Sequence, residues 1–381
     1  MGDRIPFLEA SGTTYEVGLK LGEFSQAVLG RFIDSPAAVA DREKIKAEPR
    51  ILSRSLRAAA DRYPQYMDEM RGIADGAGRS LQDIFIFNWR PRPRGAARSD
   101  RSDSSDRSDA SAHRESCTTL IVPAEYGVLL AHNEDWFTGA NDVFLARLRY
   151  EGGFDGIAIC YHGFLPGLSA SLNQYGLAQS LNNLISSDCG AGVALALIDR
   201  AALDATSVDE AIKIVTQAGR ADSENFNFAQ RRRAVYVELS ARDFALVEVT
   251  KPAAHTNHYV AERMLALEAN PRLDSTRHRL ARATAMLAAK TVPGTVLGPE
   301  NLKAILSSHE DAPWCICRHL RRGGAEAAAG SDQSDRSDRS DAPGPRDYGV
   351  TLATAVIDTA ARTFDVCIGN PCTAPFRQFT L

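Results

Sequence analysis

A polar repeat divides this chain of 381 residues and limits which parts of it can fold. Residues 98–109 read RSDRSDSSDRSD, a run with no apolar side chain and with charges of both signs. Such a segment cannot bury enough apolar surface to offset the entropy lost on ordering it, so we predict that it is disordered. The folded structure must therefore be built from the segments on either side.

A cysteine stands shortly after this repeat, at the start of a predicted β-hairpin. Cys117 follows Ser116 and precedes the β-branched and apolar run Thr118–Val122; a turn then leads to a second strand from Val128 to Ala131. If the peptide bond before Cys117 were cut, one residue would carry both a thiol and a free α-amino group. An α-amine has a pKa near ~8 and can act as the base for its own thiol. The sequence therefore predicts a cleavage point between Ser116 and Cys117.

Composition excludes several classes of protein. The apolar fraction of 44% allows a large core, and the formal net charge of -4 gives no basic field for nucleic acid. Residues 1–6 lack the apolar core of a signal peptide, and no apolar run approaches the ~20 residues of a membrane span. We expect a cytoplasmic protein with no nucleic-acid or membrane partner.

The cysteines do not form a recognisable metal or disulfide pattern. There are seven, an odd number, and no C-x-x-C pair accompanies them. Cys160 and Cys367 lie inside apolar strand-like runs, where a cysteine usually packs as a small hydrophobic residue. We expect no metal and no cofactor.

Periodicity predicts a mixed α+β fold. Helical patterns cover Thr13 to about Ala77 and a short segment from Ser80, and after the hairpin strand blocks alternate with helix pairs. The further strands are expected at residues 143–150, 156–161, 168–172, 177–181, 234–239, 244–249, 350–357 and 363–368, and the further helices at residues 194–203, 207–215, 276–289 and 299–307. We predict two antiparallel sheets sandwiched by helices. The Rossmann, P-loop, zincin and nucleophile-elbow motifs are absent from the sequence.

The composition shifts suggest three parts. Residues 1–90 form a helical front part, residues 91–116 a low-complexity linker that ends at the cleavage site, and residues 117–381 a catalytic part. A second Ser-Asp-Arg insert interrupts the catalytic part at residues 323–346. We interpret both inserts as expanded surface loops.

Four separated motifs resemble one known family. They are Cys117-Thr118-Thr119, Asn133-Glu134-Asp135-Trp136, His255-Thr256-Asn257-His258 and Ile316-Cys317-Arg318. In this order they resemble the isopenicillin N acyltransferase-like N-terminal nucleophile (Ntn) hydrolases, and the resemblance covers nearly the whole chain. It implies a four-layer αββα sandwich and an inactive precursor. In that precursor the Cys117 thiol attacks the Ser116 carbonyl, an acyl shift from nitrogen to sulfur forms an ester, and water releases two chains that stay associated.

The resemblance also implies roles for individual residues. Cys117 matches the nucleophile, and Asp135 matches the aspartate that holds the free α-amino group. Asn257 matches an oxyanion donor, and Asn182 lies where related amidases keep a second one. Arg318 matches an arginine near the nucleophile that lowers the thiol pKa and fixes Asp135. Each residue type also has an ordinary structural use: a buried strand cysteine, a capping aspartate, turn asparagines or a salt-bridged arginine.

The implied activity is that of an autoprocessed cysteine amidohydrolase or acyltransferase. Family members act on penicillin side chains or on β-alanyl amides of dopamine and histamine, so the expected substrates are small N-acyl amines or amides. The other expected partners are an acyl-CoA or amine acceptor and the cleaved front chain. Two alternatives stay open from the residues alone. One is an uncleaved binding protein of the same fold, and the other is a Cys/His thiol protease that uses His255 or His258.

Overall fold

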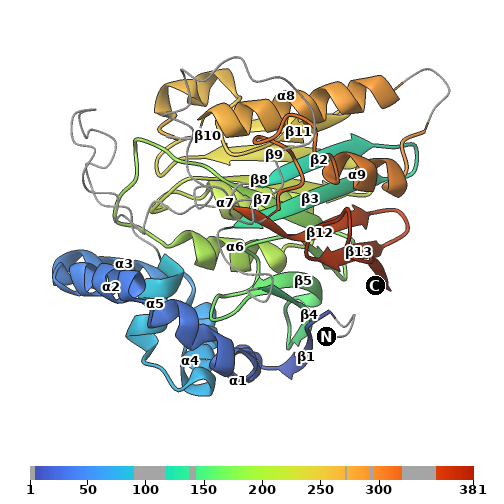
Figure 1. Cartoon of the computed structure of the whole chain (residues 1–381). Coiled ribbons are helices and arrows are strands. Elements are labelled where there is room, and N and C mark those ends of the chain that lie inside the picture. The colour runs from blue at the N-terminus through green and yellow to red at the C-terminus, as the bar shows by residue number, and fades with distance from the viewer. Residues whose placement is uncertain (1–4, 90–116, 137–142, 271–272, 292–295, 320–348) are drawn as a thin grey trace, which may run out of the picture.

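Two sheets packed face to face, with helices on both outer faces, form the molecule (Figure 1). This computed structural model describes residues 5–89, 117–136, 143–270, 273–291, 296–319 and 349–381. Ser116 and both polar inserts, the first of which we predicted to be disordered, lie outside these ranges. The four-layer αββα sandwich expected from the sequence is confirmed.

The larger sheet has eight strands. They are β1 (Phe7–Gly12), β4 (Val143–Tyr150), β5 (Asp155–Tyr161), β6 (Ser171–Asn173), β7 (Ala178–Asn183), β8 (Glu224–Gln230), β9 (Arg233–Leu239) and β10 (Phe244–Glu248), in this spatial order. Neighbouring strands are antiparallel except β1 and β4, which pair in parallel with Phe7 opposite Leu145. The prediction of purely antiparallel sheets is wrong at this edge, because β1 comes from the front of the chain and joins the sheet from outside the hairpin series.

The smaller sheet has six strands. They are β11 (Ala253–His255), β2 (Thr118–Pro123), β3 (Val128–Trp136), β12 (Val350–Asp358), β13 (Thr363–Ile368) and β14 (Arg377–Thr380), in this spatial order. The predicted hairpin is confirmed: β2 and β3 are antiparallel, with Thr118 opposite Asn133. This register places Cys117, the residue before β2, beside Glu134 near the end of β3.

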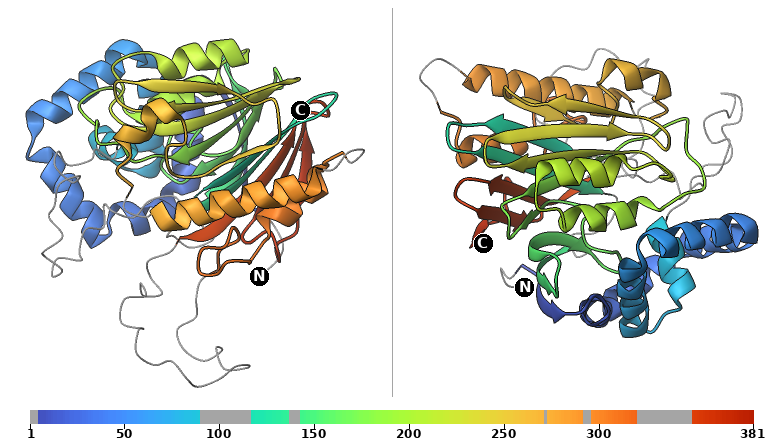
Figure 2. Two further views of the ribbon diagram at one scale, coloured as in Figure 1. Left: turned by 90° about the horizontal axis from the view of Figure 1, so that it is seen from above. Right: turned by 180° about the vertical axis from the view of Figure 1, so that it is seen from behind.

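Helices cover both outer faces (Figures 1 and 2). They are α1 (Thr14–Ile33), α2 (Pro36–Lys46), α3 (Pro49–Arg62), α4 (Pro64–Ala77), α5 (Leu81–Trp89), α6 (Leu195–Leu203), α7 (Val208–Thr216), α8 (Leu273–Lys290) and α9 (Pro299–Leu306), with a short 3-10 helix at Glu262–Leu267. One apolar cluster joins α1 and α4–α7 to the eight-stranded sheet, a second fills the space between the sheets, and a third lies between the six-stranded sheet and α8 and α9. No helix among the described residues is long and apolar enough to cross a membrane.

Local signals explain several helix ends. The side chain of Thr13 accepts a hydrogen bond from the Glu16 N–H at the start of α1, and Glu16 in turn caps the Thr13 N–H. At the end of α4, Gly78 takes a left-handed conformation with φ of 64°. Ser80 Oγ then accepts a hydrogen bond from the Asp83 N–H, so this serine caps α5, the short helix predicted to begin there.

Candidate active site

Cys117 is buried where the two sheets meet. Its Sγ lies 3.6 Å from Glu134 Oε1, and the Tyr161 hydroxyl donates to the same oxygen over 2.7 Å. Because Cys117 and Thr119 are two residues apart in an extended segment, both side chains face the eight-stranded sheet. The thiol therefore points into the sandwich, toward a carboxylate supplied by β3.

A chain of polar contacts continues from this carboxylate. The other Glu134 oxygen lies 3.1 Å from His132 Nε2, and His132 Nδ1 lies 2.9 Å from Thr119 Oγ1. All of these side chains are buried. The thiol consequently has a carboxylate as its neighbour and an imidazole one contact further away, a set of groups able to accept and pass on a proton.

Arg279, from the middle of α8, holds the Cys117 main chain from the opposite side. Its Nη1 donates to the Cys117 carbonyl oxygen over 2.6 Å and to Thr118 Oγ1 over 2.9 Å, and its Nη2 donates to Asn257 Oδ1 over 2.9 Å. Burial, with a smaller contribution from the neighbouring Arg318 cation, lowers the pKa of Arg279 to about 9. The guanidinium therefore remains charged at neutral pH and fixes two of the candidate residues at once.

Asp135 lies on the same side of the sheet as Arg279, in contact with Arg318. Its Oδ1 accepts from the Thr351 hydroxyl over 2.7 Å, and Arg318 Nε lies 3.7 Å from Oδ2. Within the described part of the chain, Oδ2 has no hydrogen-bond donor. Burial raises the pKa of Asp135 to about 6, although the Arg318 and Arg279 cations act in the opposite direction. This oxygen is thus a buried acceptor that could still take a hydrogen bond.

Arg318 is held by several partners of its own. Its N–H donates to Thr351 Oγ1 over 2.9 Å, and its Nη2 donates to Ser275 Oγ. Thr351 therefore contacts both Arg318 and Asp135. The structure brings together the predicted pair Asp135 and Arg318.

Asn182 lies in a buried cluster of amides between the sheets. Its Oδ1 accepts from Thr119 Oγ1, Asn225 Nδ2 and Asn227 Nδ2 at 3.1, 3.1 and 2.9 Å. Its own Nδ2 is buried and has no acceptor among the described residues. Three donors therefore fix the orientation of an amide whose N–H groups remain available.

Asn257 connects Arg279 to the strand that carries Asn182. Its Nδ2 donates to the Asn183 carbonyl oxygen over 3.1 Å, while its Oδ1 accepts from Arg279. One of its two amide protons is therefore committed to the main chain. Cys117, Arg279 and Asn257 form one connected group.

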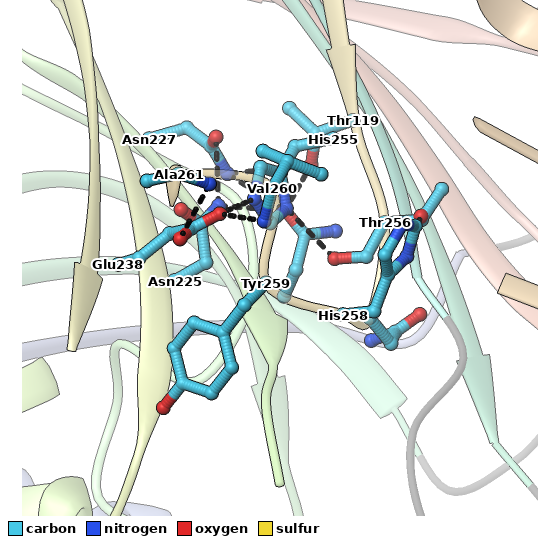
Figure 3. Close-up of polar contacts among 12 residues, drawn as sticks. Thr119, Asn225, Asn227, Glu238, His255, Thr256, His258, Tyr259, Val260 and Ala261 are labelled. Atoms are coloured by element: carbon cyan, nitrogen blue, oxygen red, sulfur yellow. Dashed lines mark hydrogen bonds and ion pairs between the residues drawn. The ribbon is translucent and has the colours of Figure 1, made fainter. Parts of the chain in front are cut away.

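The two predicted alternative histidines have partners elsewhere. His255 Nε2 lies 2.9 Å from Glu238 Oε1, and His255 Nδ1 lies 2.8 Å from the Thr256 carbonyl oxygen. Figure 3 shows Glu238 facing both the His255 ring and the N–H groups of Val260 and Ala261. His258 Nδ1 contacts the Thr256 and Thr276 hydroxyls, and burial lowers its pKa to about 4. Both histidines organise the loop that presents Asn257.

Sequence reasoning missed Arg279, Glu134 and Tyr161 as site residues. The sequence did contain a signal for Arg279. It lies on the buried face of α8, at helical spacing from Ser275, Thr276, Ala283 and Leu287, and a charged residue among small and apolar ones on such a face is unusual. Glu134 stood within a noted motif without a role. For Tyr161, which comes from the other sheet, no local pattern could indicate the contact.

Comparison with known proteins finds several that this chain resembles in sequence. The family model described as acyl-coenzyme A:6-aminopenicillanic acid acyl-transferase matches residues 123–329. The acyl-coenzyme A:6-aminopenicillanic-acid-acyltransferase 40 kDa form of Emericella nidulans is 26% identical over 94% of this chain and 91% of its own length. The β-alanyl-dopamine/carcinine hydrolase of Drosophila melanogaster is 26% identical over 59% of this chain, and the match spans only 61% of that hydrolase.

Among solved structures, penicillin V acylase from Agrobacterium tumefaciens matches with a TM-score of 0.44 and 14% identity, over 70% of this chain and 86% of the acylase. The family model alone spans more than half of the 381 residues. The chain therefore belongs to the acyl-coenzyme A:6-aminopenicillanic acid acyl-transferase family.

Proposed function

We propose that this protein is an autoprocessed cysteine amidohydrolase or acyltransferase with Cys117 as its nucleophile. The observation that carries the proposal is the environment of Cys117. Its thiol lies beside the Glu134 carboxylate, and its main chain is held by the buried Arg279 guanidinium. The same Arg279 contacts Asn257, and the Asp135–Arg318 pair lies on that side of the sheet.

Self-cleavage begins without a free α-amine, so another group must take the thiol proton. Glu134 is the group in place, at 3.6 Å from the sulfur. The thiolate attacks the Ser116 carbonyl carbon, the C–N bond to Cys117 breaks, and the proton passes to the departing nitrogen. Water then hydrolyses the thioester, which leaves a carboxylate on Ser116 and both a thiol and an amine on Cys117.

Turnover follows the same route with the new amine as base. The amine accepts the thiol proton, and Asp135 Oδ2 stabilises the ammonium that forms. The acyl group of the substrate moves to Cys117, the amine part leaves with a proton, and water or a second amine releases the acyl group. Arg318 and Thr351 hold the Asp135 carboxylate in position throughout.

Asn182 and Asn257 are the proposed oxyanion donors. Support for Asn182 comes from its buried Nδ2, which has no acceptor among the described residues although three donors fix the side chain. Support for Asn257 comes from the second proton of its Nδ2 and from the contact with Arg279. Removal of one oxyanion donor typically costs ~10²–10³ in kcat.

The proposed substrates are small N-acyl amines or amides. This rests on the relatives, whose names specify β-alanyl-dopamine, carcinine and 6-aminopenicillanic acid. The acceptor that the second relative's name implies is an amine, with an acyl-coenzyme A as donor. Screening should therefore pair N-acyl amines with water, and acyl-CoA thioesters with amines.

Intact mass under denaturing conditions tests the processing step. The wild-type protein should give two species, and the larger should begin at Cys117, whereas Cys117→Ala should remain full length. A full-length wild type with no turnover would remove the proposal and favour an uncleaved binding protein. If Cys117→Ala were cut at the same bond, an external protease would be the cause.

The variant His132→Gln tests whether a histidine acts together with the Cys117 thiol, because His132 is the histidine that contacts the Glu134 carboxylate.

A further inference from the structure

A second group of reactive side chains lies outside the proposed catalytic residues. It consists of His309 in the loop after α9, Cys317 and His319 in the segment around Arg318, and Cys372 in the turn after β13. The two sulfurs and two ring nitrogens all lie within 4.8 Å of one another. The sequence did not indicate this group, because Cys372 is 55 residues from Cys317 and no C-x-x-C pair is present.

Four of the six distances among the ligand atoms match edges of a small tetrahedron, and the other two, between His309 and the sulfurs, are no longer than 4.8 Å. Cys317 Sγ lies 3.7 Å from Cys372 Sγ and 3.6 Å from His319 Nε2; His319 Nε2 lies 3.2 Å from Cys372 Sγ and 3.0 Å from His309 Nε2. A tetrahedral zinc ion with bonds of ~2.3 Å to sulfur and ~2.0–2.1 Å to nitrogen has edges of ~3.8 Å between sulfurs, ~3.6 Å between sulfur and nitrogen and ~3.3 Å between nitrogens. Each observed distance agrees with its edge to about 0.4 Å.

The chemistry of the four donors also suits a zinc ion. Thiolate and imidazole ligands select zinc and similar metals over magnesium or calcium, which prefer oxygen. Asn370 Nδ2 donates to Cys317 Sγ over 3.7 Å, a contact of the type that orients a thiolate ligand.

We propose that His309, Cys317, His319 and Cys372 bind one Zn²⁺ ion in a closed tetrahedral site with a structural role. The ion displaces the two thiol protons to solvent, and it connects the segment that holds His309, Cys317 and His319 to Cys372, which lies 53 positions after His319. Cys317 is buried, while the other three ligands are exposed, so the ion can enter from the surface.

The proposed zinc site also bears on the position of Arg318. This residue stands between two of the ligands, and the Asn370 amide donates to its carbonyl oxygen. Zinc would fix the main chain on both sides of the arginine whose Nε lies 3.7 Å from Asp135 Oδ2. This consequence, unlike the zinc site itself, rests on the proposed function, in which Arg318 is a positioning residue for Asp135.

Metal binding can be measured without substrate, so its result is independent of the proposed activity. The purified protein should contain one zinc per chain. After removal of zinc, Co²⁺ alone should give the intense visible absorption and the sulfur-to-cobalt charge-transfer band of a tetrahedral site. Cys372→Ser and His309→Ala replace exposed ligands, and each should weaken Co²⁺ binding at least tenfold and lose the rise in melting temperature that Zn²⁺ gives to the wild type.

Cys117→Ala is the matched control, because Cys117, His132 and Glu134 form another group of possible ligands in the described part of the chain. It should retain the full Co²⁺ spectrum and the zinc-dependent rise in melting temperature. A spectrum lost in Cys117→Ala but kept in Cys372→Ser would overturn the proposal. So would a Cys317–Cys372 disulfide in the purified protein, found as a mass lower by two hydrogens and as a linked peptide. If substrate turnover failed while the zinc results held, only the proposed function would be lost.

Discussion

Burial raises the pKa of the Asp135 carboxyl group to about 6, which brings its titration close to neutral pH. If its carboxylate form is required, the rate of self-cleavage should fall about tenfold per pH unit below ~6, because the fraction of charged Asp135 falls by that factor. In the mature protein the new Cys117 ammonium favours the charged form of Asp135. The acid limb of turnover should therefore lie at lower pH than the acid limb of self-cleavage.

Two pH profiles test this prediction: the rate of appearance of the back chain by mass spectrometry, and the kcat of the mature protein. Asp135→Asn should process slowly at every pH and show no limb near 6. The exposed Asp209 of α7 supplies the control, and Asp209→Asn should keep the wild-type profile. Coincident limbs for the two reactions would contradict the role given to the ammonium.

Glu134→Gln should separate self-cleavage from turnover. The variant keeps the shape of the side chain and can still contact Tyr161, but it cannot accept the thiol proton. Loss of a general base typically costs ~10²–10⁴ in rate, so processing should slow by at least ~10². In the fraction that does mature, the α-amine is the base, and kcat should fall by less than ~10. Quenched time courses of processing and steady-state kinetics on the separated mature form measure the two rates. Equal losses in both would assign Glu134 a general structural role instead.

At the scale of elements, α1 and α4 approach each other through four glycines. A Cβ atom on Gly18, Gly22, Gly72 or Gly76 would lie 2.1–2.3 Å from a main-chain carbonyl oxygen of the other helix. Gly18 and Gly22 on α1 are four residues apart, and so are Gly72 and Gly76 on α4, so the two glycines of each helix lie on one face. Main-chain atoms cannot move aside as a flexible side chain can. The close distance between the two helix axes therefore depends on glycine at these four positions.

Gly76→Ala should destabilise the protein by ~1–3 kcal/mol or more, because overpacking forces the helices apart. Gly30→Ala, on α1, is the matched control. Its nearest neighbour would be the Arg79 side chain at 3.4 Å, and alanine should stabilise the helix by ~0.5–1 kcal/mol. Urea unfolding of both variants in the uncut Cys117→Ala chain measures the two free energies. An unchanged free energy of unfolding in Gly76→Ala would show that the two helices can move apart without loss of stability.

The strands show what the sequence could and could not indicate. The alternation of apolar residues predicted β2, β4, β5, β9, β10, β12 and β13 with boundaries close to those observed. It missed β8, because Asn225 and Asn227 alternate with Phe226 and Phe228, and asparagine is disfavoured in strands. Both asparagines face the interior of the sandwich and bond to Asn182. The residues that hide the strand are those that orient the candidate oxyanion donor.

The same limit applies to the site. Cys117, Asp135, Asn182, Asn257 and Arg318 were proposed from motifs. The contact of Arg318 with Asp135 required the pairing of β12 with β3, which brings Thr351 opposite Asp135. Arg279 reaches Cys117 across 162 positions of the chain. No short pattern encodes a contact of that separation, so the sequence indicated five candidate residues, and the fold supplied their arrangement and the further residues Arg279, Glu134 and Tyr161.

At the scale of the whole molecule, a buried ion pair connects the front part to the rest. Arg200 of α6 donates from Nε to Glu69 of α4 over 2.8 Å, Tyr150 of β4 donates to the same carboxylate over 2.6 Å, and the guanidinium lies over the Tyr150 ring. Arg200 and Glu69 are fully buried. Removal of one charge leaves the other without compensation, which typically costs ~3–5 kcal/mol.

Glu69→Gln in the uncut Cys117→Ala chain should lower the free energy of unfolding by about that amount, as measured in urea. In the cut protein the same change should weaken retention of the front chain on a sizing column under mild denaturant. Glu248→Gln breaks an exposed pair with Arg233 and should change stability by less than ~1 kcal/mol. If both variants behaved alike, the buried pair would not be what holds the two parts together.

The parallel pairing of β1 with β4 has a consequence for how the protein can be made. The front part supplies an edge strand, with Phe7 opposite Leu145, to a sheet whose other strands all come from beyond the proposed cut. In the uncut chain this strand finds its place in a first-order reaction whose rate does not depend on concentration. After the cut, the same step becomes an encounter between two molecules, so recovery from denaturation should slow in proportion to dilution. Folding before cutting is then the only order of events that remains efficient at the low concentration of a newly made chain.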